Sequence, residues 1–491
     1  MCGLFAVGVQ LAAGCSSPYT EGASEPLPVR DAKDATPAEA STDAGASGGP
    51  SLRTEWVKTF GVGDGTPDSG PYVRFRDVAV NSGGASYVTG DFSDVDLPIG
   101  SEVLRSGGGP DALLFRLDGA GNPSDAVKLG EANEQYGFAV ATTEQLTYVS
   151  VLLKGAVRLG GDTVTNTGTG YTSVVSRFAP AYAQSRPAAG SNDVFIKRLA
   201  PDLAGGVLAF GDFTPNVTVV GTTFTTSGTG LVLARMFGTG GESARALYGA
   251  DGGAALGNSL ASSASGGILL TGRFVGDLPL GAAGTLSTKQ PHAFVIRVGQ
   301  DLAPTGARDI GGSGVAEGIA VAAIPSGAGF IVAGTFAGTL ALPGQAAITT
   351  AGGPDIFVIR FDDAGNVVWV RTFGGASDDV VSGVAVDDDD NVFVAGSYAS
   401  PSIDFGGGPL VNSDLGANGS HDVFLTHLGG DGRHLYSARF GDAGDQIATA
   451  VGVDAKRGVL VVGYFTGAID FGTGAQEAKG RTDAFAAKLT Y

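Results

Sequence analysis

The stretch that decides the fold is 354–398, PDIFVIRFDDAGNVVWVRTFGGASDDVVSGVAVDDDDNVFVAGSY. Its turn residues divide it into four segments that are short, rich in Val, Ile and Phe, and flanked by Gly, Asp or Asn, as β-strands are. The predicted strands are 355–361, 366–373, 382–386 and 391–398. Between the first two, the residues DDAGN fit a tight hairpin, because Gly365 can adopt a positive φ without steric penalty.

The same unit recurs along the chain with a period of about 62 residues. A small residue that closes each YVTG-like strand marks the copies at Gly90, Ser150, Gly211, Gly272, Gly334, Gly396 and Gly463. Successive markers are 60, 61, 61, 62, 62 and 67 residues apart. The starts of the DAFVIRF-like strands give a second set of seven positions, Asp111, Thr172, Gly230, His292, Asp355, Asp422 and Asp483. Two independent markers that agree on seven copies predict an array of repeated units.

The two ends of the array predict a closed ring. The last copy stops at DAFAAKLTY (483–491) without the WVRTFG-like strand that should follow, and the body of the chain begins with that strand, WVKTFG at 56–61. An open solenoid would gain nothing from this displacement, whereas a ring gains a last sheet without an exposed edge. We therefore predict an all-β fold for residues 53–491: a seven-bladed β-propeller of four-stranded blades, closed by the N-terminal strand joining the last blade.

Four motifs in the deciding stretch resemble those of a known family. They are PDIFVIRFDDAGN (354–366), WVRTFGG (369–375), GVAVD (383–387) and VFVAG (392–396). In these motifs the chain resembles the SBBP, or seven-bladed beta-propeller, repeat family, which is common among secreted and surface proteins of bacteria. The resemblance covers 53–491 and implies the propeller fold. It implies no particular activity, because the repeats are structural and a fold does not specify a function.

The amino-terminal sequence predicts where the protein is located in the cell. Residues 1–14, MCGLFAVGVQLAAG, are apolar and uncharged and lead directly into Cys15, which resembles the lipobox of bacterial lipoprotein signal peptides. Residues 15–52 are rich in Ser, Ala, Gly, Pro, Asp and Glu, so they cannot bury enough apolar surface to offset the entropy of ordering. We expect a signal peptide at 1–14, a lipidated Cys15, and a disordered tether at 15–52. This layout predicts an outer-membrane lipoprotein of the cell envelope, held to the membrane by its lipid.

The amino-acid composition restricts the kinds of partner and site that the chain can offer. The chain has 49 acidic and 30 basic residues, a net charge of −19, which repels phosphate backbones and argues against nucleic-acid binding. Its cysteines are Cys2 and Cys15, so the propeller itself offers no disulfide and no cysteine-ligated metal. Gly accounts for 82 of the 491 residues, as expected for many strands joined by many turns.

The strand order predicts one face rich in loops. We place GVAVD innermost, then VFVAG and DIFVIRF, with WVRTF outermost, so that the interblade links and the long second-to-third connections open on the same face. Candidate metal ligands on that face are Asp378, Asp379, Asp442 and Asp445, because hard cations such as Ca²⁺ need several oxygen ligands. No segment matches a DxDxDG-type loop, so solvated turn carboxylates are the competing interpretation and no cofactor is expected otherwise.

Other chemistry-bearing residues give weaker signals. The run of four aspartates at 387–390 falls on an inner-to-second-strand turn, and His421, His427 and His434 lie close in sequence without any reason to converge. No GxSxG elbow is present, so no catalytic residue is predicted. A pair of carboxylates about 5–10 Å apart, as glycosidases use, can be neither identified nor excluded.

Three functions fit these observations. The first is a non-enzymatic, lipid-anchored module that binds a protein or glycan partner at the cell surface through its loop-rich face. The second is an extracellular lyase or hydrolase that uses carboxylates on that face. The third is a purely structural component of the envelope.

Overall fold

The computed structural model describes residues 52–63, 70–130, 133–159, 162–179, 181–248, 250–413, 420–442 and 444–491. The chain divides into two compact units, Met1–Ser41 and Thr42–Tyr491, and only the second contains described residues. The expected signal peptide, Cys15 and nearly all of the expected tether therefore lie outside the described residues. Leu52, which we had assigned to the tether, packs into the propeller core.

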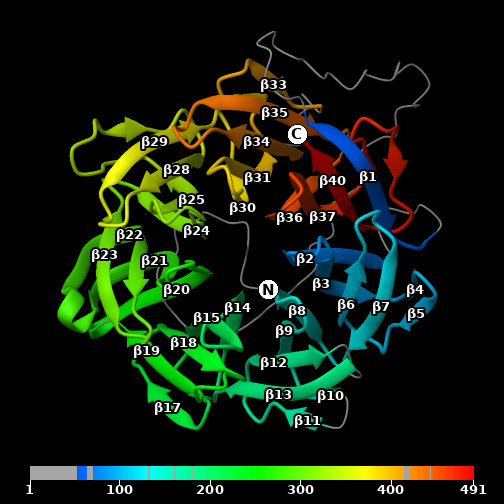
Figure 1. Ribbon diagram of the computed structural model, residues 1–491, viewed down its shortest axis with the longest axis horizontal. Helices are drawn as coiled ribbons and strands as arrows, with labels where there is room; N and C mark the ends of the chain where they lie inside the picture. The colour runs from blue at the N-terminus through cyan, green and yellow to red at the C-terminus, as the bar shows by residue number, and fades with distance from the viewer. Residues whose placement is uncertain are drawn as a thin grey trace, which may run out of the picture. The chain divides into compact units, whose positions relative to one another are not determined.

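The described chain is almost entirely β-structure, arranged as seven antiparallel sheets around a central axis (Figure 1). The innermost strands, from blade 1 to blade 7, are β2 (Tyr72–Val80), β8 (Gln135–Thr142), β14 (Val194–Pro201), β20 (Ala250–Ser262), β24 (Val315–Ala323), β30 (Asp379–Val386) and β36 (Gln446–Val453). Each inner strand contacts that of the next blade, and β36 contacts β2, so the ring is closed. No helix of the described residues is long and apolar enough to cross a membrane.

The remaining strands follow in the predicted radial order. The second strands are β3 (Ser86–Ser93), β9 (Thr147–Leu153), β15 (Val207–Phe213), β21 (Ile268–Pro279), β25 (Phe330–Ala337), β31 (Val392–Tyr398) and β37 (Gly458–Phe465). The third strands are β6 (Asp111–Leu117), β12 (Thr172–Ala179), β18 (Gly230–Met236), β22 (Thr285–Val298), β28 (Asp355–Phe361), β34 (Asp422–Leu428) and β40 (Asp483–Thr490). The outermost strands are β7 (Pro123–Leu129), β13 (Ala181–Ala189), β19 (Ser243–Tyr248), β23 (Pro304–Ile310), β29 (Val367–Phe373), β35 (His434–Phe440) and β1 (Arg53–Phe60).

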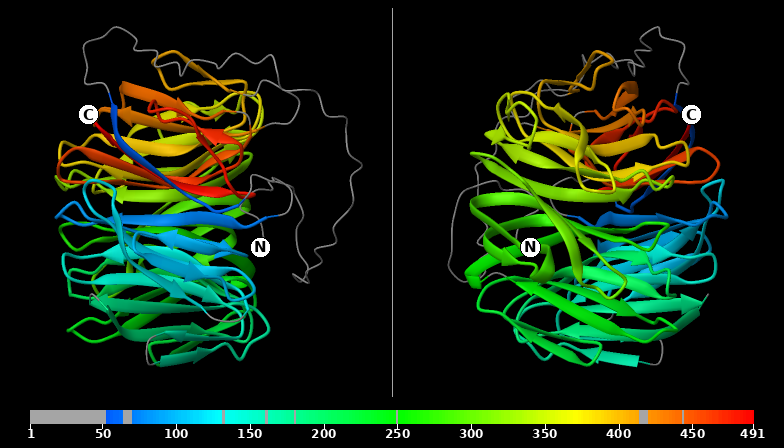
Figure 2. Two further views of the ribbon diagram at one scale, coloured as in Figure 1. Left: turned by 90° about the vertical axis from the view of Figure 1, so that its right-hand side faces the viewer. Right: turned by 60° about the vertical axis from the view of Figure 1, so that its left-hand side comes forward.

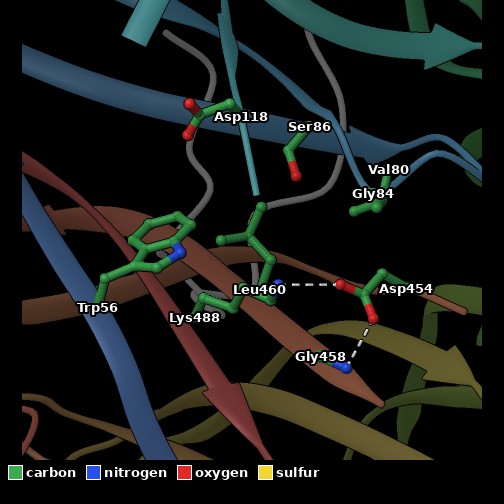
Figure 3. A pocket seen from close by; sticks show the side chains of 9 residues that line it. All are labelled: Trp56, Val80, Gly84, Ser86, Asp118, Asp454, Gly458, Leu460 and Lys488. Carbon is green, nitrogen blue, oxygen red and sulfur yellow. Dashed lines mark hydrogen bonds and ion pairs between the residues drawn. The ribbon is translucent and has the colours of Figure 1, made fainter. Parts of the chain in front are cut away.

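The predicted closure is confirmed. Strand β1 pairs with β40 in antiparallel register from Arg53 opposite Thr490 to Phe60 opposite Ala484, and it forms the outer strand of blade 7. Trp56 of β1 then joins blade 7 to blade 1, because its indole Nε1 donates to the Gly119 carbonyl oxygen at 3.1 Å. Beneath this indole, Lys488 Nζ lies 3.1 Å from an Asp454 carboxylate oxygen (Figure 3).

The marker glycines that revealed the repeat have a packing reason. Each inner strand carries a β-bulge, and a Cβ atom at Gly396 would lie only 2.1 Å from the Val380 carbonyl oxygen beside that bulge. In the other blades with a marker glycine, a Cβ atom would approach an inner-strand carbonyl oxygen to within 1.7–2.1 Å. In three blades a third-strand Phe ring also packs on the glycine. In these six blades only glycine permits so close an approach, whereas blade 2 has Ser150 opposite its bulge, and the period read from the sequence is the period of the bulge.

The second-to-third connections form arms that clamp neighbouring blades. Most are small hairpins: β4 (Asp96–Ile99) with β5 (Glu102–Arg105), β10 (Ala156–Leu159) with β11 (Asp162–Thr165), β16 (Asn216–Val219) with β17 (Thr222–Thr225), β26 (Thr339–Leu340) with β27 (Ile348–Thr349), β32 (Ser402–Asp404) with β33 (Pro409–Val411), and β38 (Ala468–Ile469) with β39 (Gln476–Glu477). In blade 4, β21 and β22 extend and enclose a 3-10 turn, η1 (Gly281–Ala283).

Arm residues pack on the outer strand of the preceding blade. Phe405 lies 4.8 Å from Phe373 between ring centroids, and Phe471 lies 4.5 Å from Phe440. The arm of blade 3 goes further, because β16 pairs with β13 and enlarges the sheet of blade 2 from four strands to six. The apolar side of the arms therefore stabilises the ring and is not available to a partner.

A candidate binding site on the loop-rich face

The ends of the strands form the two opposite faces of the ring (Figure 2). On one, the interblade links lie beside the arms, since Ser400 at the start of an arm donates its hydroxyl at 2.8 Å to Asp379, where a link enters its inner strand. We call this the loop-rich face. The other holds the inner-to-second and third-to-outer turns, and we call it the turn face. The predicted side-by-side arrangement of links and arms is thus confirmed.

Most of the aspartates that repeat along the chain are structural. At the starts of the third strands, Asp111, Asp355, Asp422 and Asp483 each accept a backbone N–H from the returning segment of their own arm, at 2.6, 3.0, 2.7 and 2.9 Å. On the turn face, Asp118, Asp362, Asp387 and Asp454 accept backbone N–H groups within their own turns. Because side-chain acceptors of this kind fix turns, the acidic composition reflects the number of turns.

The four candidate metal ligands fall at two different seams. Asp378 and Asp379 lie where the link from β29 enters β30, whereas Asp442 and Asp445 belong to the link between β35 and β36. Within the part of the chain that the structure describes, no group of three or more His, Cys, Asp or Glu side chains is placed to hold a metal ion. The structure does not bring the four together.

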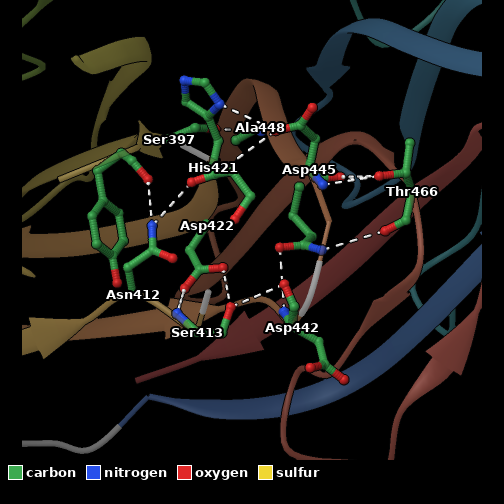
Figure 4. Close-up of polar contacts among 12 residues, drawn as sticks. Ser397, Asn412, Ser413, His421, Asp422, Asp442, Asp445, Ala448 and Thr466 are labelled. Carbon is green, nitrogen blue, oxygen red and sulfur yellow. Dashed lines mark hydrogen bonds and ion pairs between the residues drawn. The ribbon is translucent and has the colours of Figure 1, made fainter. Parts of the chain in front are cut away.

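One aspartate of each pair already accepts hydrogen bonds from the protein. Asp379 is buried and accepts from the Gly375 N–H at 2.8 Å and from the Ser400 N–H and hydroxyl. Asp445 is paired with His421, whose N–H and Nδ1 lie 3.1 and 3.2 Å from the same carboxylate oxygen (Figure 4). Hydrogen bonds from the protein lower the availability of these oxygens to a cation.

Burial of Asp379 has a measurable consequence. Burial raises the pKa of this carboxyl from 3.8 to about 6, so between these pH values the folded state holds a proton that the unfolded chain has lost. Wild-type stability at this group therefore falls as pH rises through that window. Relative to wild type, Asp379→Asn should gain roughly 3 kcal/mol between pH 4 and pH 7, at 1.36 kcal/mol for each unit of pKa difference.

Urea unfolding of both proteins at the two pH values measures this difference. The exposed Asp442→Asn is the matched control and should track wild type at both. A stability difference between Asp379→Asn and wild type that is the same at pH 4 and pH 7 would contradict the assignment.

The histidines and the aspartate run remain separate. His421 pairs with Asp445, His434 Nε2 lies 3.0 Å from Ser437 Oγ, and His427 is buried in the core. In the run 387–390, Asp387 is buried and accepts the hydroxyl hydrogen bond of Tyr491. The run lies on the predicted turn, where Asp388 and Asp389 are exposed, while Asp387 holds Tyr491 in place.

The most unusual chemistry of the loop-rich face lies at the start of β2, beside the axis. Arg74 and Arg76 meet aromatic rings from blades 7, 1 and 2 and the buried Asp91 of β3; we call Tyr72, Arg74, Arg76, Asp91, Tyr136 and Tyr464 the arginine–tyrosine cluster. Arg74 Cζ lies 5.1 Å from the Tyr72 ring centroid and 5.0 Å from that of Tyr464. Arg76 Cζ lies 5.4 Å from the Tyr136 ring centroid, and its Nε forms a short ion pair with Asp91.

The register of the inner strands shows that Arg74 is exceptional. The bulge residue of each inner strand has no cross-strand partner, and Arg74 stands two residues before it. In the other six blades this position holds Tyr136, Phe195, Leu256, Glu317, Val380 and Ile447. Glu317 is matched by Arg273 at 3.3 Å, while the described residues give Arg74 no ion-pair partner and its buried Nε no hydrogen-bond acceptor.

Sequence reasoning missed this cluster, although a signal exists. The segment YVRFRD at 72–77 places two arginines where the deciding stretch has Val380 and Ser382. A search for charged departures from the repeat, instead of for known metal or catalytic motifs, would have identified Arg74.

A cavity of about 470 Å³ lies between blades 1 and 2. Asp125 occupies the sequence position that Trp369 holds in blade 5, where Trp369 Nε1 donates to the Gly430 carbonyl oxygen. Blade 2 also lacks a DDAGN-like turn, since β12 ends at Ala179 and β13 begins at Ala181. With both halves of the usual seam contact replaced, the space between these blades is left unfilled.

Comparisons with known proteins give distant similarities. No curated protein matches the chain. Among solved structures, a protein of unknown function from Dyadobacter fermentans shares 10% identity at a TM-score of 0.42, covering 90% of this chain and 99% of that one. Hydrazine synthase of Kuenenia stuttgartiensis shares 10% identity at a TM-score of 0.40, covering 78% and 91%. Sqt1 from Chaetomium thermophilum shares 12% at 0.34, covering 88% and 87%. Similarities this low carry no argument about function.

The sequence profile of the SBBP beta-propeller repeat matches residues 368–397, which run from the outer strand of blade 5 into β31 of blade 6. This segment lies within the stretch from which we predicted the repeat. The chain is therefore a seven-bladed β-propeller that carries the SBBP-type beta-propeller repeat.

Proposed function

We propose that this chain is a non-enzymatic binding module of the bacterial cell envelope, anchored by a lipid on Cys15, that holds a protein or glycan partner at its loop-rich face. The observation that carries the proposal is the arginine–tyrosine cluster. It places Arg74, between two tyrosine rings, where the other six blades have apolar or aromatic residues or a matched charge, and arginine and tyrosine are enriched at binding surfaces.

The direction of the chain supports an anchor on the other side. Strand β1 begins at Arg53 opposite Thr490, at the turn face, and runs toward the loop-rich face. A tether that precedes Leu52 therefore enters the propeller on the face opposite the cluster. An anchored propeller of this kind can present the cluster to a partner without obstruction at its point of attachment.

The buried carboxylates do not favour the hydrolase or lyase alternative. Asp379, whose pKa burial raises to about 6, is a candidate acid on electrostatic grounds. Its side chain is fully buried and accepts three hydrogen bonds, so a substrate cannot reach it without local opening.

Anchoring is tested by labelling. Cells expressing wild type should incorporate labelled palmitate and retain the protein in the membrane fraction, whereas Cys15→Ser should lose the label and move to the soluble fraction. Cys2→Ser is the matched control and should behave as wild type. Equal labelling of wild type and Cys15→Ser would reject the lipid anchor.

Binding is tested with the Cys15→Ser full-length protein on arrays of envelope glycans and purified envelope proteins, with and without Ca²⁺. The proposal is supported if a single class of partner binds the protein with an unchanged cluster and no longer binds when the cluster is substituted. Turnover of a polysaccharide or ester would instead support the enzymatic alternative, and calcium-dependent retention would support the proposed Ca²⁺ site.

A further inference from the structure

The arginine–tyrosine cluster has the features of an anion site, and this inference rests on the proposed function because it names the chemistry that the loop-rich face would recognise. We infer that Arg74 binds a carboxylate group of the ligand at the axial end of blades 7, 1 and 2.

Among the described residues, Arg74 lacks the ion-pair partner that the other inner-strand cations have. Lys197 lies 2.8 Å from Asp212, Arg198 lies 2.5 Å from Asp77, and Arg76 is paired with Asp91. Asp91 stands directly across the β2–β3 ladder from Arg74, yet its ion pair goes to Arg76. The Nε of Arg74 is buried without an acceptor among the described residues, which is costly because its desolvation is not repaid by a hydrogen bond. An external oxyanion would supply the missing acceptor.

The guanidinium is held in place before any ligand arrives. The Tyr72 and Tyr464 rings, from neighbouring blades, both lie about 5 Å from Arg74 Cζ, so they support the side chain through cation–π contacts. The planar fork of arginine matches the two oxygens of a carboxylate, and pre-orientation reduces the entropy lost on binding.

The charge of the cluster matches a single negative charge. Two arginines against one aspartate leave a surplus of +1, and the nearby Asp445 and Arg481, which act on Tyr464 and Tyr72, carry opposite charges that leave this sum unchanged. The tyrosines do not alter this sum at neutral pH, because burial raises the pKa of Tyr72 and raises that of Tyr136 to about 12. A carboxylate carries one charge, whereas a phosphate carries about 1.5 to 2 at neutral pH. The exposed Arg481, 5.5 Å from the Tyr72 ring centroid, adds attraction at the rim.

The test uses Arg74→Gln in the full-length Cys15→Ser protein, titrated with tri-galacturonic acid, neutral maltotriose, inorganic phosphate, and one short peptide with either a free or an amidated C-terminus. We expect tri-galacturonate or the free-carboxyl peptide to bind wild type in calorimetry, with affinity that falls as salt rises. Whichever carboxylate binds identifies the source of the group. Arg74→Gln should weaken it about tenfold or more, as expected for loss of a charged hydrogen bond.

Arg457→Gln is the matched control, because Arg457 also lies over a tyrosine, with Cζ 5.9 Å from the Tyr491 ring centroid, but sits on the turn face and is paired with Asp389 at 2.8 Å. It should bind as wild type does. Arg74→Lys, which keeps the charge and loses the fork, should bind with intermediate affinity, and Arg481→Gln serves as a second variant if Arg74→Gln melts early.

Equal binding by wild type and Arg74→Gln, tighter binding of phosphate than of any carboxylate, or no carboxylate binding to wild type at millimolar concentration would each overturn the inference. The outcome is independent of the proposed function, since the probes are defined compounds. Carboxylate binding without a retained envelope partner would reject only the proposed function, and a partner retained by Arg74→Gln would reject only the site.

Discussion

Deletion of β1 (residues 53–60) should cost the propeller at least about 5 kcal/mol of unfolding free energy, because it removes the buried Phe60, the half-buried Trp56 and the ladder with β40. The deletion leaves β40 as an unpaired edge along the whole of blade 7. It also removes Phe60, whose ring centroid lies 5.1 Å from Phe75 and 5.2 Å from Phe115 in the seam with blade 1. Thermal unfolding followed by circular dichroism would show a lower and broader transition, with aggregation through the free edge.

A circular permutant provides the control for this deletion. Because Arg53 pairs with Thr490, the two ends of the described chain are adjacent, and a DDAGN turn copied from 362–366 can join Tyr491 directly to Arg53. The permutant would begin at Gly70, restore the covalent hairpin that the other blades have, and unfold at or above the temperature of wild type. If the deletion variant melted as wild type does, β1 would not be the strand that closes the ring.

Replacement of His427 by Phe should remove most of the acid sensitivity of the last two blades. Burial lowers the pKa of His427 from 6.5 to about 4, and neither ring nitrogen has a hydrogen-bond partner among the described residues. Between these pH values the unfolded chain binds the proton that the folded state refuses, so wild-type stability falls as pH drops from 6.5 to 4. The expected loss is roughly 3 kcal/mol, at 1.36 kcal/mol per unit of pKa.

Phe fits the site because His427 already behaves as an aromatic core residue. Its ring is stacked on Phe393 with 4.3 Å between the centroids, and its centroid lies 5.0 Å from that of Tyr491. His427→Phe should therefore be at least as stable as wild type at pH 7 and exceed it increasingly toward pH 4 in urea unfolding. His421→Phe, on the loop-rich face, should leave the wild-type slope in place. A parallel pH dependence of wild type and His427→Phe would refute the assignment. The pH dependence of stability expected at His427 has the opposite sign to that expected at Asp379. The variant with both substitutions therefore separates the contributions of the two groups.

The architecture could be predicted from the sequence because it depends on features that recur along the chain. A bulge faced by glycine in six blades, DDAGN-like turns in some blades and an apolar third strand each leave a periodic trace, and the displaced WVKTFG segment predicted the pairing of β1 with β40. The arms were harder, because their clamping role depends on which outer strand they reach. Phe405 and Phe471 look like loop residues in sequence and are core residues in space.

The candidate site could not be predicted in the same way, because it is the part of the molecule that does not repeat. Arg74 gains its meaning from Tyr464, 390 positions along the chain, and the ring closure alone brings the two together. Counting carboxylates led instead to Asp379 and Asp445, which bind the protein's own donors. A repeated acid usually serves the repeat, whereas an isolated departure such as Arg74 is the better guide to a ligand.

The direction of β1 also determines how the molecule bears mechanical load. If a ligand grips the axial end of β2 while the polypeptide is pulled from Leu52, tension passes along β1 and across its ladder with β40. The pull is parallel to the strand, so the ladder is sheared and its hydrogen bonds must rupture together, not one after another as in peeling. The pairing of β1 with β40, which no hairpin connects, is thus loaded in the direction in which a strand ladder is strongest.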